Sequence, residues 1–152
     1  MNTDTPQAII AYGREVIRAE SAALQSLTAR LDRRFAQAVG LVLNCTGRVA
    51  VTGIGKAGIV GQKISATLAS TGTPSFWLQA SEARHGDLGR IVREDLVLIL
   101  SNSGETEEIV SLLSPVKKIG AAIISITGEP KSTLGRHSDV VLDLGKIEEA
   151  CP

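Results

Sequence analysis

Five short apolar runs alternate with helical stretches over the last two thirds of the chain. Several of these runs are apolar at consecutive positions, as strands covered by helices on both faces must be. They are RVAVTG (48–53), PSFWLQ (74–79), DLVLILS (95–101), AAIISIT (121–127) and DVVLDL (139–144). Residues 56–71 and 105–118 between them have helical periodicity. The alternation predicts an α/β fold with a three-layer, doubly wound parallel sheet.

The N-terminal residues have a different pattern. Apolar side chains recur every seven residues, at Ile10, Ile17, Leu24 and Leu31, with polar side chains between them. This spacing predicts a long helix or a helical hairpin over 5–44. We expect a 1–46 helical segment that packs on a 47–152 domain. A second interpretation, compatible with the first, is that the helix also packs against another subunit.

The charge and residue totals exclude several classes of protein. Sixteen basic and sixteen acidic residues leave no net charge, which argues against a nucleic-acid-binding surface. Cys45 and Cys151 form no CxxC pair, so neither a disulfide framework nor a zinc site is expected. No apolar run reaches the ~20 residues of a membrane span, and the N-terminus does not have the pattern of a signal peptide. We therefore expect a cytoplasmic protein without membrane contact.

Two loops follow predicted strands at the edge of the sheet where ligands bind in such folds. The first, TGIGKAG (52–58), carries a GxG and Lys56 but lacks the spacing of a nucleotide P-loop. Gly53, Gly55 and Gly58 fit the dinucleotide pattern GxGxxG, yet the acidic residue expected ~20 positions later is missing. NAD binding is therefore disfavoured. The glycines could also serve only a tight strand–helix turn.

The second loop, SNSGETEEI (101–109), predicts an anion site. Ser101, Ser103 and Thr106 offer hydroxyl groups, and Gly104 allows a sharp backbone turn. A helix that begins near residue 105 would add unpaired N–H groups and its positive dipole end. A phosphate monoester fits these donors. In the alternative interpretation, Ser103 only caps the helix.

Three glutamates follow the hydroxyl residues. In a helix that starts here, Glu105 and Glu108 share a face and Glu107 points elsewhere. Carboxylates in the first turn stabilise a helix, which is the simplest explanation for each of them. A glutamate that reaches into the cleft could instead take and return a carbon-bound proton.

SNSGETEEI resembles the S-x-S-G-x-T loop of sugar isomerase (SIS) domains, which have a Rossmann-like fold. TGIGKAG, ASTGTPSFWLQASEARHGDLG, ISITGEPKSTLGRHSDVVLDL and EEACP together resemble the D-arabinose 5-phosphate isomerase family. The resemblance begins near residue 8 and covers the rest of the chain. It implies an aldose–ketose isomerase that interconverts D-ribulose 5-phosphate and D-arabinose 5-phosphate through a cis-enediol. That reaction belongs to the 3-deoxy-D-manno-octulosonate route to lipopolysaccharide.

The resemblance also implies residue roles. Lys56 matches the active-site lysine, Glu108 the catalytic glutamate, and Glu149 a second one. We favour Glu108 as the base, with Glu149 as its rival. The expected substrate-binding residues are Gly55, Gly72, Thr73, His85, Ser101, Asn102, Ser103 and Thr106.

No cofactor or metal is required for this chemistry. Many members of the family carry a histidine, associated with a bound metal ion, where this chain has Gln79. Because an amide is a poor ligand for transition metals, we predict weak or absent metal binding there.

The family continues past EEACP with a further helix, and many members add CBS modules. We therefore expect the chain to be C-terminally truncated relative to the family, with apolar surface left open. SIS domains typically form dimers or tetramers, so a homodimer or homotetramer is expected. Two rival functions remain: a non-catalytic sugar-phosphate-binding SIS module, and an isomerase for another sugar phosphate.

Overall fold

The computed structural model describes residues 5–83 and 86–147. Helices and strands alternate as the sequence predicts. The elements are α1 (Pro6–Leu27), η1 (Thr28–Arg30), α2 (Arg33–Leu43), β1 (Val49–Gly53), α3 (Gly55–Ser70), β2 (Ser75–Trp77), α4 (Ala80–Ala83), η2 (Asp87–Arg90), β3 (Leu96–Leu100), α5 (Glu107–Ile119), β4 (Ala122–Thr127), α6 (Thr133–His137) and β5 (Val140–Asp143).

The five strands form one parallel sheet in the order β2-β1-β3-β4-β5. β1 therefore has a neighbour on each side. The chain adds β2 on one side of β1 and then crosses over to add β3 on the other side. The register pairs Thr52 of β1 with Ile99 of β3, and Ile99 with Ser125 of β4. The predicted fold class is confirmed.

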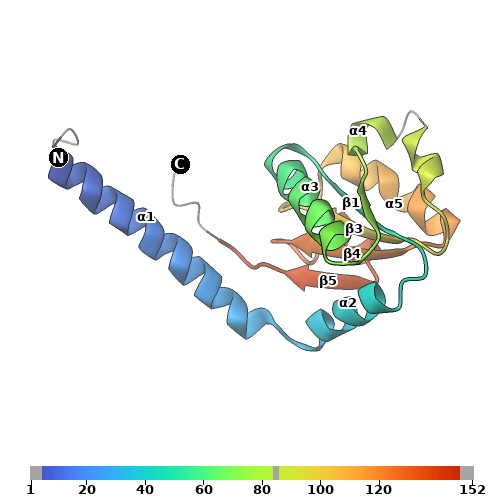
Figure 1. Cartoon of the computed structure of the whole chain (residues 1–152), viewed down its shortest axis with the longest axis horizontal. Helices are drawn as coiled ribbons and strands as arrows, with labels where there is room; N and C mark the ends of the chain where they lie inside the picture. The colour runs from blue at the N-terminus through green and yellow to red at the C-terminus, as the bar shows by residue number, and fades with distance from the viewer. Residues whose placement is uncertain (1–4, 84–85, 148–152) are drawn as a thin grey trace.

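Helices cover both faces of the sheet, which explains the nearly continuous apolar strands (Figure 1). On one face, α4, α5 and α6 pack against the inward side chains of β1, β3 and β4, and Ile99, Ile109 and Leu134 are fully buried. On the other face, α2 and α3 cover a second cluster that includes Val51 and Leu98. These two cores fix the positions of the loops at the strand ends.

The N-terminal region is two helices rather than one. α1 begins at Pro6 after Thr5, whose hydroxyl accepts a hydrogen bond from the Ala8 N–H. The helix ends before Leu31, which is extended, and Asp32 caps α2 by accepting from the Arg34 N–H at 2.8 Å.

Only part of the N-terminal segment packs on its own domain. α2 contacts β5 and buries Ala38. Figure 1 shows α1 extending away from the sheet, and none of its residues 6–27 is buried. Within the described residues, α2 therefore contacts the sheet, whereas α1 buries none of its side chains. Within the described ranges, no helix has the length and apolarity needed to cross a bilayer.

Candidate functional site

The loops after β1 and β3 lie side by side because these strands are parallel neighbours. α3 begins at Gly55 and α5 at Glu107, both at the carboxyl edge of the sheet. Their N-cap residues, Ile54 and Thr106, make no side-chain capping hydrogen bond. An anion at this edge would therefore face the N-terminal ends of both helices.

A hollow of about 400 Å³ lies between the two loops. Lys56 lines one side. The other side is lined by the loop of residues 101–106, which we call the hydroxyl loop, through Ser101, Asn102, Ser103 and Thr106. The structure thus brings together the lysine and the three hydroxyl residues that the sequence singled out. A hollow with these donors and one cation suits a phosphate group.

Hydrogen bonds within the hydroxyl loop fix its shape. The buried Ser101 hydroxyl accepts from the Gly104 N–H at 3.2 Å and shares a hydrogen bond of 3.1 Å with the Thr106 hydroxyl. Ser103 is not the cap of α5, because its hydroxyl accepts from the Glu105 N–H at 3.3 Å, before the helix begins. Gly104 has a φ of 62°, which favours glycine.

A second hollow of about 420 Å³ adjoins the first, and Ile54 lines both. Glu108 from the first turn of α5 faces it, together with Gly53 and Gly55 of the β1 loop. Glu108 is therefore set beside the hydroxyl loop rather than among its donors.

The wall of the second hollow also contains three residues that the sequence analysis did not single out: Ile59, Gln62 and Trp77. Trp77 reaches the hollow because Gly58 and Gly61 of α3 leave room for its ring: a Cβ on Gly61 would lie 2.7 Å from Trp77 Cζ3. The pair of glycines is the signal in the sequence that could have pointed to it. Gln79, on the same wall, accepts from Trp77 Nε1 at 3.2 Å and donates to the Ser81 hydroxyl at 3.3 Å.

The sequence suggested that Glu105 and Glu108 share a helical face. They do not, because α5 begins at Glu107, two residues after Glu105. Its carboxylate accepts a hydrogen bond of 2.6 Å from the Thr133 N–H, at the start of α6. The backbone and side-chain hydrogen bonds of Thr133, with a smaller contribution from Arg136, lower the pKa of Glu105 below its ordinary value.

Two expected substrate-binding residues do not reach these hollows. Gly72 and Thr73 precede β2 and line a different hollow with Gly47 and Val49, at the amino edge of the sheet. Within one chain they are therefore separate from Lys56 and the hydroxyl loop, because parallel strands put their starts and their ends at opposite edges. Two other expected site residues, His85 and Glu149, lie outside the described residues.

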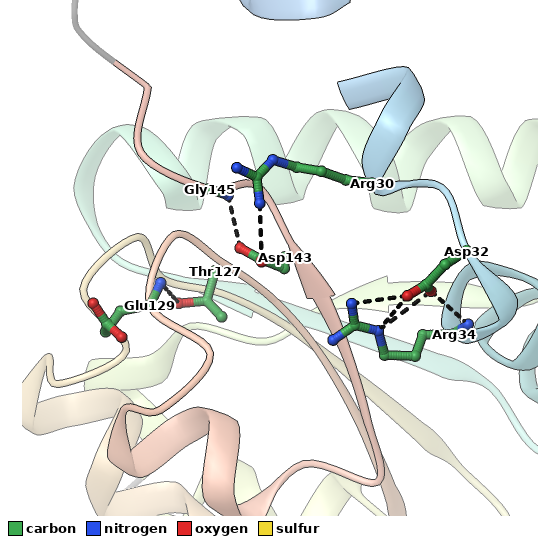
Figure 2. Close-up of polar contacts among 7 residues, drawn as sticks. All are labelled: Arg30, Asp32, Arg34, Thr127, Glu129, Asp143 and Gly145. Carbon is green, nitrogen blue, oxygen red and sulfur yellow. Dashed lines mark hydrogen bonds and ion pairs between the residues drawn. The ribbon is translucent and has the colours of Figure 1, made fainter. Parts of the chain in front are cut away.

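The ends of β4 and β5 extend the carboxyl edge (Figure 2). The Thr127 hydroxyl accepts from the Glu129 N–H at 3.1 Å and donates to the Asn102 carbonyl at 3.1 Å. Asp143 accepts from Arg30 Nη1 at 3.0 Å and, through its other oxygen, from the Gly145 N–H at 2.7 Å. These contacts link the hydroxyl loop and the α1–α2 connection to the last strands.

The fold and the loops at its carboxyl edge define the class of protein: the chain belongs to the SIS domain family, whose family model matches residues 42–151. Among curated relatives, the chain is 49% identical over 152 residues to arabinose 5-phosphate isomerase KdsD of Pseudomonas aeruginosa, covering 100% of this chain and 47% of that protein. It is 48% identical over 145 residues to arabinose 5-phosphate isomerase KpsF of Escherichia coli O6:H1, covering 95% of this chain and 44% of that protein.

A solved structure agrees with these relatives. The chain is similar to E. coli CFT073 c3406, solved in complex with arabinose 5-phosphate, with a TM-score of 0.91 and 36% identity. The match covers 96% of this chain and 78% of that one. The chain spans about half the length of the curated relatives it matches.

Proposed function

We propose that the chain is the sugar-phosphate-binding and catalytic domain of an aldose–ketose isomerase acting on D-ribulose 5-phosphate and D-arabinose 5-phosphate. The observation that carries the proposal is the pair of adjoining hollows: one lined by Lys56 and the hydroxyl loop, the other by Glu108. The names of the relatives and the ligand of the similar structure support the choice of substrate.

The geometry suggests how the two ends of the sugar are held. The phosphate occupies the first hollow, where Ser101, Ser103 and Thr106 line the wall near the N-termini of α3 and α5. The carbonyl end then extends toward the second hollow. A phosphate bound to fixed donors places the reacting carbons at a set distance from the acid–base group.

Isomerisation moves the carbonyl between C1 and C2 through a cis-enediol: a proton leaves one carbon and is added to the other, while a hydroxyl proton moves from one of the oxygens O1 and O2 to the other. Glu108 removes the proton from one carbon and returns it to the other, and such acid–base catalysis contributes roughly 10²–10⁴-fold. Lys56 lines the first hollow, where it neutralises the phosphate. The family resemblance gives it a second possible role, stabilising the charge that develops on the enediol oxygens. Glu149 is the rival base, and His85 is proposed to contact the substrate; both assignments rest on the family resemblance.

A coupled assay with D-ribulose 5-phosphate tests the proposal, on this chain and on a version extended to the length of its relatives. We expect Glu108→Gln to lower kcat by roughly 10²–10⁴-fold. Glu149→Gln tests the rival, and Glu94→Gln, at the opposite edge of the sheet, is the matched control. Unchanged turnover in both site variants contradicts the acid–base assignment. Sugar-phosphate binding with no turnover by either length indicates a non-catalytic module.

Self-association belongs to the same proposal. α1 exposes Ile10, Ile17 and Leu24 at seven-residue spacing and buries none of its residues. An apolar stripe of this kind suits a homodimer or homotetramer. Light scattering of the parent and of Ile17→Asp tests this.

A cytoplasmic location and a role in lipopolysaccharide synthesis, expected from the sequence and the resemblance, are also part of the proposal. Cell fractionation tests the location.

A further inference from the structure

Glu105 lies in the middle of the hydroxyl loop but lines neither hollow. Its carboxylate instead contacts the first residue of α6, accepting from the Thr133 N–H at 2.6 Å. The two residues are 28 positions apart. A long-range hydrogen bond from the centre of the loop needs an explanation that the catalytic assignments do not give.

Two further contacts join the same segments. The Leu134 N–H donates to the Gly104 carbonyl at 3.0 Å, next to the Glu105–Thr133 bond. Gly104 packs directly on Ser132: a Cβ at that position would lie 2.6 Å from Ser132 Cβ and collide with its hydroxyl. Residues 104–105 and 132–134 are therefore held together at consecutive positions. We call this set of contacts the loop brace.

The brace also resolves an electrostatic conflict. A carboxylate next to a phosphate would repel it. The contact with Thr133 directs the Glu105 charge onto backbone and hydroxyl donors, and Arg136 lies near enough to add a favourable interaction. The loop can then present its amides and hydroxyls to the anion while the neighbouring charge is already paired.

We propose that Glu105 is a positioning residue, which holds the hydroxyl loop in its phosphate-binding conformation through Thr133. The inference rests on the proposed function, because it assigns the loop to the phosphate. A loop fixed before binding does not have to be ordered by its ligand, so losing the brace weakens phosphate binding. The proton-transfer step on the sugar is left unchanged.

Substitutions at both ends of the hydrogen bond test the brace. Thr133→Pro removes the N–H donor at the first position of α6, where proline is favoured. The preceding Ser132 is extended, with a ψ of 170°, as a residue before proline must be. Thr133→Ser keeps both the N–H and the hydroxyl and is the matched control. Glu105→Ala removes the acceptor, whereas Glu105→Gln keeps an acceptor oxygen without the charge.

Calorimetric titration with ribulose 5-phosphate, and separately with inorganic phosphate, gives the first measurement. We expect Glu105→Ala and Thr133→Pro to weaken both ligands by roughly two- to fivefold, the range for a charge at a helix terminus. We expect a smaller loss in Glu105→Gln and none in Thr133→Ser. In a version with turnover, KM rises and kcat is unchanged. Equal affinities in all variants, or a loss of sugar-phosphate affinity without a loss of phosphate affinity, overturn the proposal.

Amide exchange separates failure of the brace from failure of the proposed function. Without ligand, the Leu134 amide exchanges faster in Glu105→Ala than in the parent if the brace holds the loop. If the parent binds neither ribulose 5-phosphate nor phosphate, the proposed function fails, and this exchange rate alone decides the brace. An unchanged rate then overturns it.

Discussion

Gly104→Ala tests the packing of the hydroxyl loop against the turn that precedes α6. Gly104 has a φ of 62° and lies on Ser132 and Leu134, whose exposed fractions are 3% and 0%. A methyl group there would collide with the Ser132 hydroxyl and lie 3.3 Å from Leu134 Cβ. Neither neighbour can move into solvent, so the loop itself must shift.

The expected loss of stability has two parts. A left-handed backbone costs an L-residue roughly 1–2 kcal/mol. Overpacking against buried groups adds about 1–3 kcal/mol. Gly55 is the matched control, because its φ of 59° is nearly the same and a Cβ there meets no atom of the described residues within 4 Å. Gly55→Ala should therefore cost only the first part.

Urea unfolding of the parent and the two variants measures both parts. We expect Gly104→Ala to lower the free energy of unfolding by about 2–5 kcal/mol, against about 1–2 kcal/mol for Gly55→Ala. The difference between the two variants is the collision with Ser132. If the two variants lose the same stability, the loop does not pack on this turn, and the contact between Gly104 and Ser132 is refuted.

Three more predictions concern buried and hydrogen-bonded groups. Asp95→Ala lowers the free energy of unfolding by at least about 2 kcal/mol in urea, because the fully buried carboxylate accepts from the N–H groups of Arg48 (2.7 Å) and Val92 (3.1 Å); an unchanged value contradicts this. Gln79→His should raise the affinity for zinc, because a histidine is a better ligand for transition metals than an amide. Calorimetric titration of the parent with zinc should show no tight, stoichiometric binding, and such binding would refute the prediction of weak or absent metal binding at Gln79. The lowered pKa of Glu105 means that its stabilising contact is fully present above the ordinary glutamate value of about 4.3 and is lost as the pH falls through the lowered value. The stability difference between the parent and Glu105→Gln should therefore vanish in acid, and a constant difference from neutral to acid pH contradicts the assignment.

The strands were predictable because their signal is local. The run at 95–101 became β3 (Leu96–Leu100), and the run at 121–127 became β4 (Ala122–Thr127), each within one residue at either end. The N-terminal pattern was harder. Its seven-residue spacing continues through Leu31, but Asp32 caps a new helix and separates α1 from α2. The seven-residue spacing of apolar side chains therefore does not show where α1 ends and α2 begins.

The candidate site was predictable in part. Lys56 and the hydroxyls of 101–106 line one hollow, as their place after two parallel strands implied. Glu108 faces the adjoining one. Gly72 and Thr73 line a hollow at the amino edge of the sheet. The family resemblance did not indicate this position, because it assigns a role to a residue but does not place that residue at one edge of the sheet or the other.

Local sequence accounts for the alternation of strand and helix, the apolar faces and the chemical groups at the strand ends, because periodicity and residue type are properties of neighbouring positions. Which of those groups meet depends on the tertiary structure. Glu105 contacts Thr133 rather than lining either hollow, and Trp77 reaches the second hollow past Gly61, because sheet order and helix packing bring distant segments together. The local sequence pattern does not determine the distances between segments that are far apart in the chain.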